Sequence, residues 1–206
     1  MIKYFVRTTE ERSFDYDLNY ELLVDKEKKP VESFIKQLKY ISQYDSVLLE
    51  DDLILCKDFK DKIEDVIKQY PNDIINFFYN PANYFSTHYD GSFSWNQCTY
   101  YPKGVALKIA NQMEHLRKGL KHLQYDVLEH NALDTLGINH IQYRPCLVQH
   151  IDDKSLIQEG KYPPRRTIYF EDYLNELGIK YEDAYQNENR QKLRKLMNEK
   201  FKQKRR

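Results

Sequence analysis

The chain has 206 residues, which suits a single domain, and its 41% hydrophobic and 14% aromatic residues exclude an intrinsically disordered protein. No apolar run approaches the roughly 20 residues that cross a bilayer, and the amino terminus lacks the apolar core of a signal peptide, so we expect a soluble, cytoplasmic protein. The formal net charge is zero, yet basic residues far outnumber acidic ones in 187–206, which predicts a basic tail on an acidic body.

The first half of the chain reads as strands alternating with helices. Residues 2–7 and 20–24 are rich in apolar and aromatic side chains and predict two strands. Apolar stripes predict helices over 31–41 and 59–70, and Pro71 ends the second one. The apolar runs at 47–49 and 74–79 are typical of interior strands. This alternation predicts an α/β fold.

The second half is less regular. Residues 80–94 have no clear period and predict a long loop, and residues 95–101 predict a strand. An apolar stripe over 105–123 predicts a helix, and a shorter helix is expected from 126 to Gly137. Residues 141–150 predict a further strand, and residues 163–206 a mostly helical, charged tail.

Three consecutive acids, Glu50, Asp51 and Asp52, interrupt the apolar run from 47 to 55. We expect them at the carboxyl end of a strand, where open α/β sheets bind ligands. Carboxylates that converge there could bind a hard divalent cation together with substrate phosphates. A solvated turn between two strands explains the same residues equally well.

Two further positions have both a structural and a chemical interpretation. Asp126 and Glu129 have the spacing of a helix-capping box, which would explain both acids without any chemistry. His150 ends the strand predicted over 141–150, and a lone histidine there is more often a surface residue than a metal ligand. The three cysteines, Cys56, Cys98 and Cys146, form no paired motif and read as reduced, mostly buried thiols.

The segment Val-Leu-Leu-Glu-Asp-Asp at 47–52 resembles the Glu-Asp-Asp form of the Asp-x-Asp motif in GT-A-fold glycosyltransferases. The similarity covers roughly residues 1–157 and includes 95–103, Tyr125-Asp126, and 144–150 with the Asp-Asp-Lys-Ser that follows. It implies a single GT-A-like, Rossmann-like mixed sheet flanked by helices in a catalytic domain over 1–160. Residues 161–206 would then be a helical basic extension, packed on this domain or trailing from it.

The resemblance also implies site roles. Asp52 and His150 would hold Mn²⁺ or Mg²⁺, supported by Glu50, while Asp51 would approach the ribose or donor sugar and Ser155 a phosphate. Asp126 is the expected base, with Glu129 as its substitute. Only about 45 residues precede the acidic motif, so the nucleotide-binding part is shorter than is usual in the family. The candidate nucleotide contacts that remain are Arg7, Thr8, Arg12 and Asp25.

The implied activity is a metal-dependent, hexosyltransferase-like transfer of a sugar from a nucleotide-sugar donor to a hydroxyl acceptor, with inversion. A divalent ion would stabilise the charge that develops on the departing diphosphate, and a carboxylate would accept the acceptor's proton. The acceptor could be a glycan, a protein or a modified nucleobase. Two alternatives remain open: a nucleic-acid-binding accessory protein that uses the basic tail, or another metal-dependent phosphoryl or nucleotidyl transferase.

Overall fold

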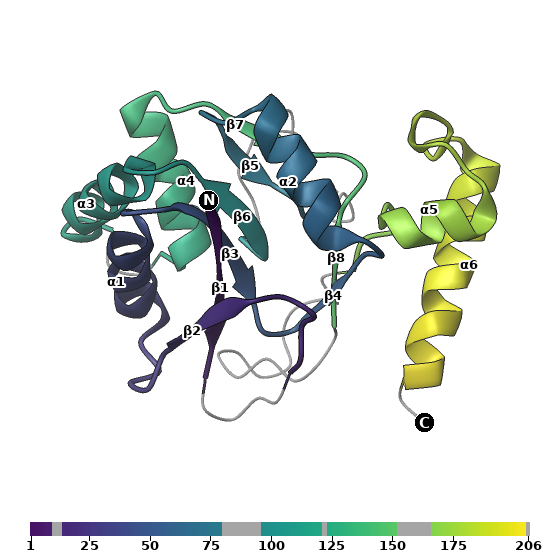
Figure 1. The fold of residues 1–206 in the computed structure, drawn as a ribbon, viewed down its shortest axis with the longest axis horizontal. Helices are drawn as coiled ribbons and strands as arrows, with labels where there is room; N and C mark the ends of the chain where they lie inside the picture. The colour runs from purple at the N-terminus through teal and green to yellow at the C-terminus, as the bar shows by residue number, and fades with distance from the viewer. Residues whose placement is uncertain (10–13, 80–95, 121–122, 152–165, 205–206) are drawn as a thin grey trace.

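The computed structural model describes residues 1–9, 14–79, 96–120, 123–151 and 166–204 (Figure 1). Its main sheet has six strands: β1 (Ile2–Thr8), β2 (Tyr20–Val24), β3 (Asp45–Glu50), β5 (Ile74–Asn76), β6 (Cys98–Tyr101) and β7 (His140–Gln142). Their order across the sheet is β2-β1-β3-β6-β5-β7. Strand β1 is parallel to β2 and β3, and β5 is parallel to β7, while β6 is antiparallel to both of its neighbours. The predicted α/β fold with a mixed, Rossmann-like sheet is therefore confirmed.

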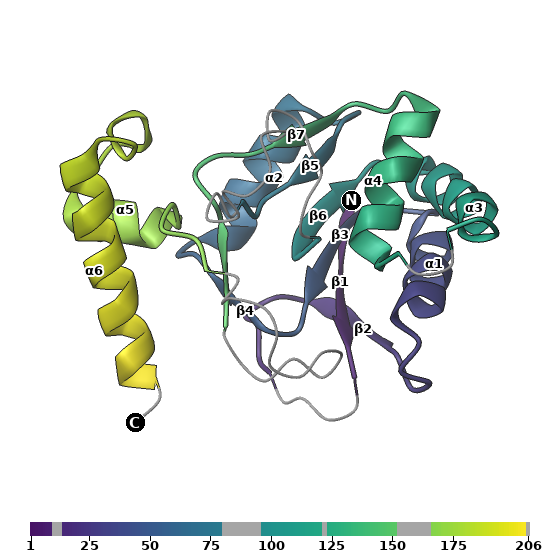
Figure 2. The same ribbon diagram turned by 180° about the vertical axis from the view of Figure 1, so that it is seen from behind.

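Helices cover both faces of this sheet (Figures 1 and 2). On one face lie α1 (Pro30–Ile41), α3 (Val105–Arg117) and α4 (Tyr125–Leu136), and on the other lies α2 (Phe59–Gln69). Side chains alternate along a strand, so Phe5 of β1 packs into the hydrophobic cluster on the side of α1, α3 and α4, and Val6 into the cluster on the side of α2. Both side chains are fully buried, so β1 is held between the two hydrophobic clusters.

A second, two-stranded sheet pairs β4 (Leu53–Leu55) with β8 (Val148–His150) in antiparallel register, and Leu53 lies opposite His150. The prediction of one strand over 141–150 is therefore wrong. Residues 140–142 form β7 in the main sheet, whereas 148–150 belong to the small sheet. Pro145 lies between them and has no backbone N–H to donate, so a single ladder cannot run through it. As a result, the chain carries His150 to the strand that begins directly after the acidic residues.

Other predicted bounds shift by a few residues. The helix predicted over 105–123 ends at Arg117, shortly before Gly119, which is a poor helix former. The strand predicted over 74–79 ends at Asn76, and the one predicted over 95–101 begins at Cys98. The helices over 31–41 and 59–70 are confirmed to within a residue at each end. The loop predicted over 80–94 lies outside the described residues.

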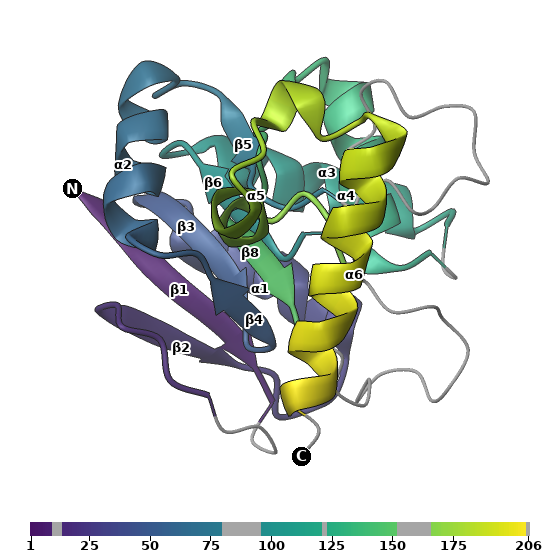
Figure 3. The same ribbon diagram turned by 90° about the vertical axis from the view of Figure 1, so that its right-hand side faces the viewer.

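The carboxyl-terminal segment is helical, as predicted (Figure 3). It contains α5 (Glu171–Leu177), a 3-10 turn (Tyr181–Asp183) and α6 (Asn187–Lys204). Leu193 of α6 is fully buried in the same hydrophobic cluster as α2, and the Lys62 Nζ of α2 lies 2.6 Å from a carboxylate oxygen of Glu171. The proposed division at residue 160 falls within 152–165, outside the described residues, and stays a prediction. None of the described helices has an apolar run long enough to cross a membrane.

Candidate metal centre

The acidic residues lie where strand β3 leaves the main sheet. Val47, Leu48 and Leu49 are buried and hold β3 in the core, and the chain bends at residues 51–52 before β4 begins. Glu50 is paired in register with Arg7, so the carboxyl ends of β3 and β1 are adjacent. From β1 the chain passes to β2 on one side and returns through α1 to β3 on the other. In open α/β sheets such a reversal of strand order marks the ligand-binding edge.

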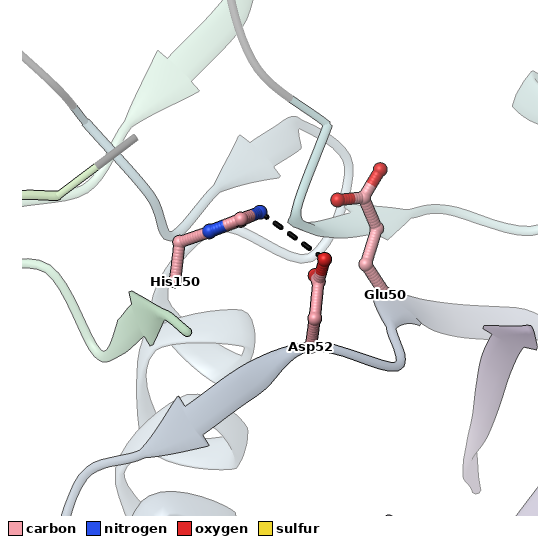
Figure 4. Close-up of side chains that lie close together, drawn as sticks. All are labelled: Glu50, Asp52 and His150. Atoms are coloured by element: carbon pink, nitrogen blue, oxygen red, sulfur yellow. Dashed lines mark ion pairs between the residues drawn. The ribbon is translucent and has the colours of Figure 1, made fainter. Parts of the chain in front are cut away.

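Glu50, Asp52 and His150 form one cluster at this edge (Figure 4). Each offers a ligand atom, and the three atoms all lie within 4.8 Å of one another. His150 Nε2 is 3.2 Å from a carboxylate oxygen of Asp52, and the two side chains are only 9% and 12% exposed. The β4–β8 pairing and a 2.7 Å hydrogen bond from the Ile151 N–H to the Asp52 carbonyl oxygen hold the two segments together. The structure thus brings together the acidic residues and the late histidine that the sequence singled out.

The donor set of this cluster fits a divalent cation. Two carboxylates supply the hard, charged oxygens that Mg²⁺ and Mn²⁺ prefer, and the imidazole supplies a nitrogen, a common ligand for transition metals. The ligand atoms lie within 4.8 Å of one another, which makes the three residues candidate ligands of one ion. Glu50, which the resemblance makes a supporting residue, is therefore as well placed to bind a metal as Asp52 and His150.

Glu50 is held by two side chains from other elements. The Tyr125 hydroxyl of α4 donates a 2.6 Å hydrogen bond to Glu50 Oε1, and Arg7 Nη1 lies 3.8 Å from the same oxygen. The Arg7 guanidinium packs against the rings of Phe34 and Tyr125, at 4.6 and 4.4 Å from their centroids. Its side chain is 11% exposed and donates to Gln37, so these contacts favour a role beside Glu50 over an outward contact to a nucleotide.

Asp51 points to a different neighbour. The Thr8 hydroxyl donates a 2.7 Å hydrogen bond to a carboxylate oxygen of Asp51, which links the acidic segment to the end of β1. Asp25 follows β2 at the same edge, where its N–H donates to the Thr8 carbonyl oxygen at 2.9 Å. Three of the predicted nucleotide or sugar contacts are thus neighbours. Arg12 and Ser155 lie outside the described residues.

The capping box predicted at Asp126 and Glu129 is not formed. Helix α4 begins at Tyr125, and Gln124 stands at the N-cap without a side-chain cap bond. Tyr125 packs on Phe34 at 5.0 Å between ring centroids and bonds Glu50, which explains why the helix starts one residue earlier than predicted. Asp126 consequently lies in the first turn, partly exposed, and accepts a 2.9 Å hydrogen bond from the Val127 N–H. Glu129 turns into the core instead.

Glu129 is fully buried on the underside of the site. It accepts a 2.7 Å hydrogen bond from the Tyr101 hydroxyl and a second bond from the Asn96 amide. Burial raises the pKa of Glu129 to about 8, although Tyr101, Arg7 and Asn96 each oppose the rise. A carboxyl group of this kind is protonated at neutral pH, so Glu129 is less suited than Asp126 to accept a proton from a substrate.

Replacing Glu129 by glutamine is expected to change how stability depends on pH. The pKa of Glu129 is higher in the folded chain than in the unfolded one, so its contribution is complete below about pH 4.5 and is lost as pH rises through about 8. Glutamine keeps the shape of the protonated carboxyl but does not ionise. Between these pH values the wild type should lose roughly 1.4 kcal/mol per pH unit relative to the variant. Urea unfolding across this range measures the difference, and parallel curves would contradict the assignment.

Three groups at this edge are not predicted as individual functional groups from the sequence: the hydroxyls of Tyr16 and Tyr125 and the Asn96 amide. The Tyr16 hydroxyl donates to the Glu50 carbonyl oxygen at 2.7 Å and accepts from the Leu53 N–H at 3.0 Å. Nothing local distinguishes Tyr16 among 18 tyrosines, since its role arises only where distant segments meet. Tyr125 and Asn96 did fall within segments that carry the resemblance.

Comparisons with known proteins add no relative. No protein-family model matches the chain, and no curated protein matches it. The chemistry of this edge therefore rests on its own residues and their geometry.

Proposed function

We propose that the chain is a metal-dependent glycosyltransferase that moves a sugar from a nucleotide-sugar donor to a hydroxyl acceptor, with inversion. The observation that carries the proposal is the convergence of Glu50, Asp52 and His150, with ligand atoms within 4.8 Å of one another, at the strand-order reversal of a Rossmann-like sheet. Ligands of open α/β sheets bind at this place. The acidic segment and its sequence resemblance to the GT-A motif support the same conclusion.

In this proposal Asp52, His150 and Glu50 hold Mn²⁺ or Mg²⁺. The cation supplies charge stabilisation for the departing nucleoside diphosphate. Asp51, held by Thr8 at the end of β1, faces the donor ribose or sugar, and Asp25 is a further candidate contact at the same edge. Arg7 supports Glu50 and does not contact the donor, because its guanidinium lies against Glu50 and two aromatic rings. Arg12 and Ser155 remain candidate contacts from sequence.

Asp126 is the proposed base. It follows Tyr125 directly, and Tyr125 donates a hydrogen bond to Glu50, so the first turn of α4 is tied to the acidic cluster. Asp126 is also partly exposed, which leaves its carboxylate accessible to an acceptor hydroxyl. Glu129 is the substitute, but its burial and raised pKa favour a structural role beneath the site.

The proposal is tested by measuring release of nucleoside diphosphate from a panel of nucleotide sugars, with and without Mn²⁺. We expect at least one donor to be turned over, and only with the metal present. Failure of every donor to bind or react would contradict the proposal. Analysis of the products separates sugar transfer from a phosphoryl or nucleotidyl transfer that uses the same carboxylates.

Exposed positive charge on α6 favours a second candidate, a nucleic-acid-binding accessory protein. Arg194, Lys195 and Lys202 are exposed on this helix, whereas Leu193 and Phe201 are buried in the core. Deleting α6 would therefore damage the fold, and replacing the three cations by glutamine is the cleaner change. Oligonucleotide binding that weakens steeply with salt and with these substitutions, without any donor turnover, would favour this candidate over the transferase.

We also propose a cytoplasmic location. The support comes from Cys56, Cys98 and Cys146, which are all buried free thiols, as is usual for proteins of a reducing compartment.

A further inference from the structure

The turn that carries the acidic residues has an unusual closure. Residues 50–53 connect β3 to β4, and in an ordinary β-turn the carbonyl oxygen of the first residue accepts a hydrogen bond from the N–H of the fourth. Here the Tyr16 hydroxyl stands between these two groups. It donates to the Glu50 carbonyl oxygen at 2.7 Å and accepts from the Leu53 N–H at 3.0 Å. One side chain from outside the turn thus satisfies both backbone groups.

This arrangement affects the two residues at the centre of the turn, whose side chains diverge. Asp51 accepts from the Thr8 hydroxyl of β1, while Asp52 lies 3.2 Å from His150 of β8. The backbone at both ends of the segment is fixed by the same hydroxyl, so the positions of Glu50 and Asp52 depend on it. A direct hydrogen bond across the turn would require its ends to come closer together.

Tyr16 is itself held firmly in place. It is only 7% exposed, and its ring lies 5.2 Å from the ring of Phe14 and 6.1 Å from that of Tyr20. This packing restricts the ring, and the hydroxyl lies at the turn. The packed rings therefore hold the Tyr16 hydroxyl in place, and the hydroxyl holds the backbone of Glu50 and Leu53.

We propose that Tyr16 is a positioning residue that sets the spacing of Glu50 and Asp52 for a divalent cation. This inference rests on the proposed function, because it concerns the same candidate metal centre. Tyr16 acts through the backbone of Glu50 and Leu53, and its hydroxyl supports the ligands from the protein side. Groups that orient metal ligands in this way commonly contribute about 10- to 100-fold in metal affinity.

The test compares Tyr16→Phe with Tyr20→Phe in the full chain. Both changes remove one hydroxyl from the same ring cluster, but only the first removes the two hydrogen bonds at the turn. Mn²⁺ binding is measured by the electron paramagnetic resonance signal of the free ion, and urea unfolding without metal measures the fold. We expect Tyr16→Phe to weaken Mn²⁺ binding about 10- to 100-fold and Tyr20→Phe to leave it within about twofold of the wild type.

The outcomes separate the two proposals. If the wild type does not bind Mn²⁺, the proposed metal centre fails, and the proposed function fails with it. If the wild type and Tyr16→Phe bind equally well, only the role of Tyr16 is overturned. A Tyr16→Phe protein that is unfolded without metal and is not restored by excess Mn²⁺ would also overturn it, since Tyr16 would then be an ordinary core residue. Recovery of turnover at high Mn²⁺, with kcat near that of the wild type, would support positioning.

Discussion

Replacing Asp52 by alanine is expected to abolish Mn²⁺-dependent turnover and to weaken Mn²⁺ binding by more than about 100-fold. The change removes a charged ligand, and loss of even an outer partner of a ligand costs about 10- to 100-fold. It also leaves His150 without the carboxylate that lies 3.2 Å from its Nε2. Calorimetric titration with Mn²⁺ and the donor-hydrolysis assay measure the two effects separately.

The chain offers a matched control for this change. His130 Nε2 lies 3.3 Å from an oxygen of Asp134 on α4, so Asp134→Ala also removes the acid of a histidine–aspartate pair. The side chain of Asp134 is 67% exposed, and we expect this variant to bind Mn²⁺ as the wild type does. Equal losses in both variants would mean that the effect of Asp52→Ala is not specific to the metal centre. Asp52→Asn, which keeps the side-chain shape, shows whether charge is what matters.

Replacing Asp126 by asparagine should leave donor and Mn²⁺ binding intact while slowing sugar transfer by about 10²- to 10⁴-fold, the usual contribution of a general base. Asparagine has the same shape and can still accept the 2.9 Å hydrogen bond from the Val127 N–H, so the first turn of α4 should persist. Single-turnover transfer measures the chemical step, and donor binding is measured by calorimetry.

Glu129→Gln serves as the comparison for that experiment. It changes the neighbouring acid of the same helix, which is buried beneath the site and bonded to Tyr101. Transfer at the wild-type rate in Asp126→Asn would show that Asp126 is not the base. If Glu129→Gln instead lost transfer while still binding the donor, the base would be reassigned to Glu129 despite its burial.

Local patterns were enough to predict the sheet and its acidic edge. The apolar run at 47–49 marks a strand, and the acids that follow it fall at the strand end as expected. The helices at 31–41 and 59–70 follow from their apolar stripes because each stripe faces one hydrophobic cluster. In these segments local preference and tertiary packing agree, which is why the sequence alone could be read correctly.

The errors have a common physical origin in contacts between distant segments. The capping box at Asp126 and Glu129 was a sound local pattern, but Tyr125 gains a hydrogen bond to Glu50 when the helix starts at its position. The prediction of a single strand over 141–150 is wrong because its two ends pair in different sheets, one as β7 and the other as β8. The hydroxyl of Tyr16 could not be assigned at all, since it meets Glu50 from 34 residues away.

The antiparallel pairing of Leu53 with His150 limits how this protein could vary in length. Because side chains alternate along a strand, inserting one residue between Val148 and His150 would turn the imidazole to the opposite face. Inserting two would restore its direction but displace it along the strand. Point substitutions elsewhere on β4 and β8 leave the direction of the histidine unchanged. Within this small sheet, changes in length should therefore be tolerated far less than changes in composition, and natural variants should keep the number of residues from Val148 to His150 constant.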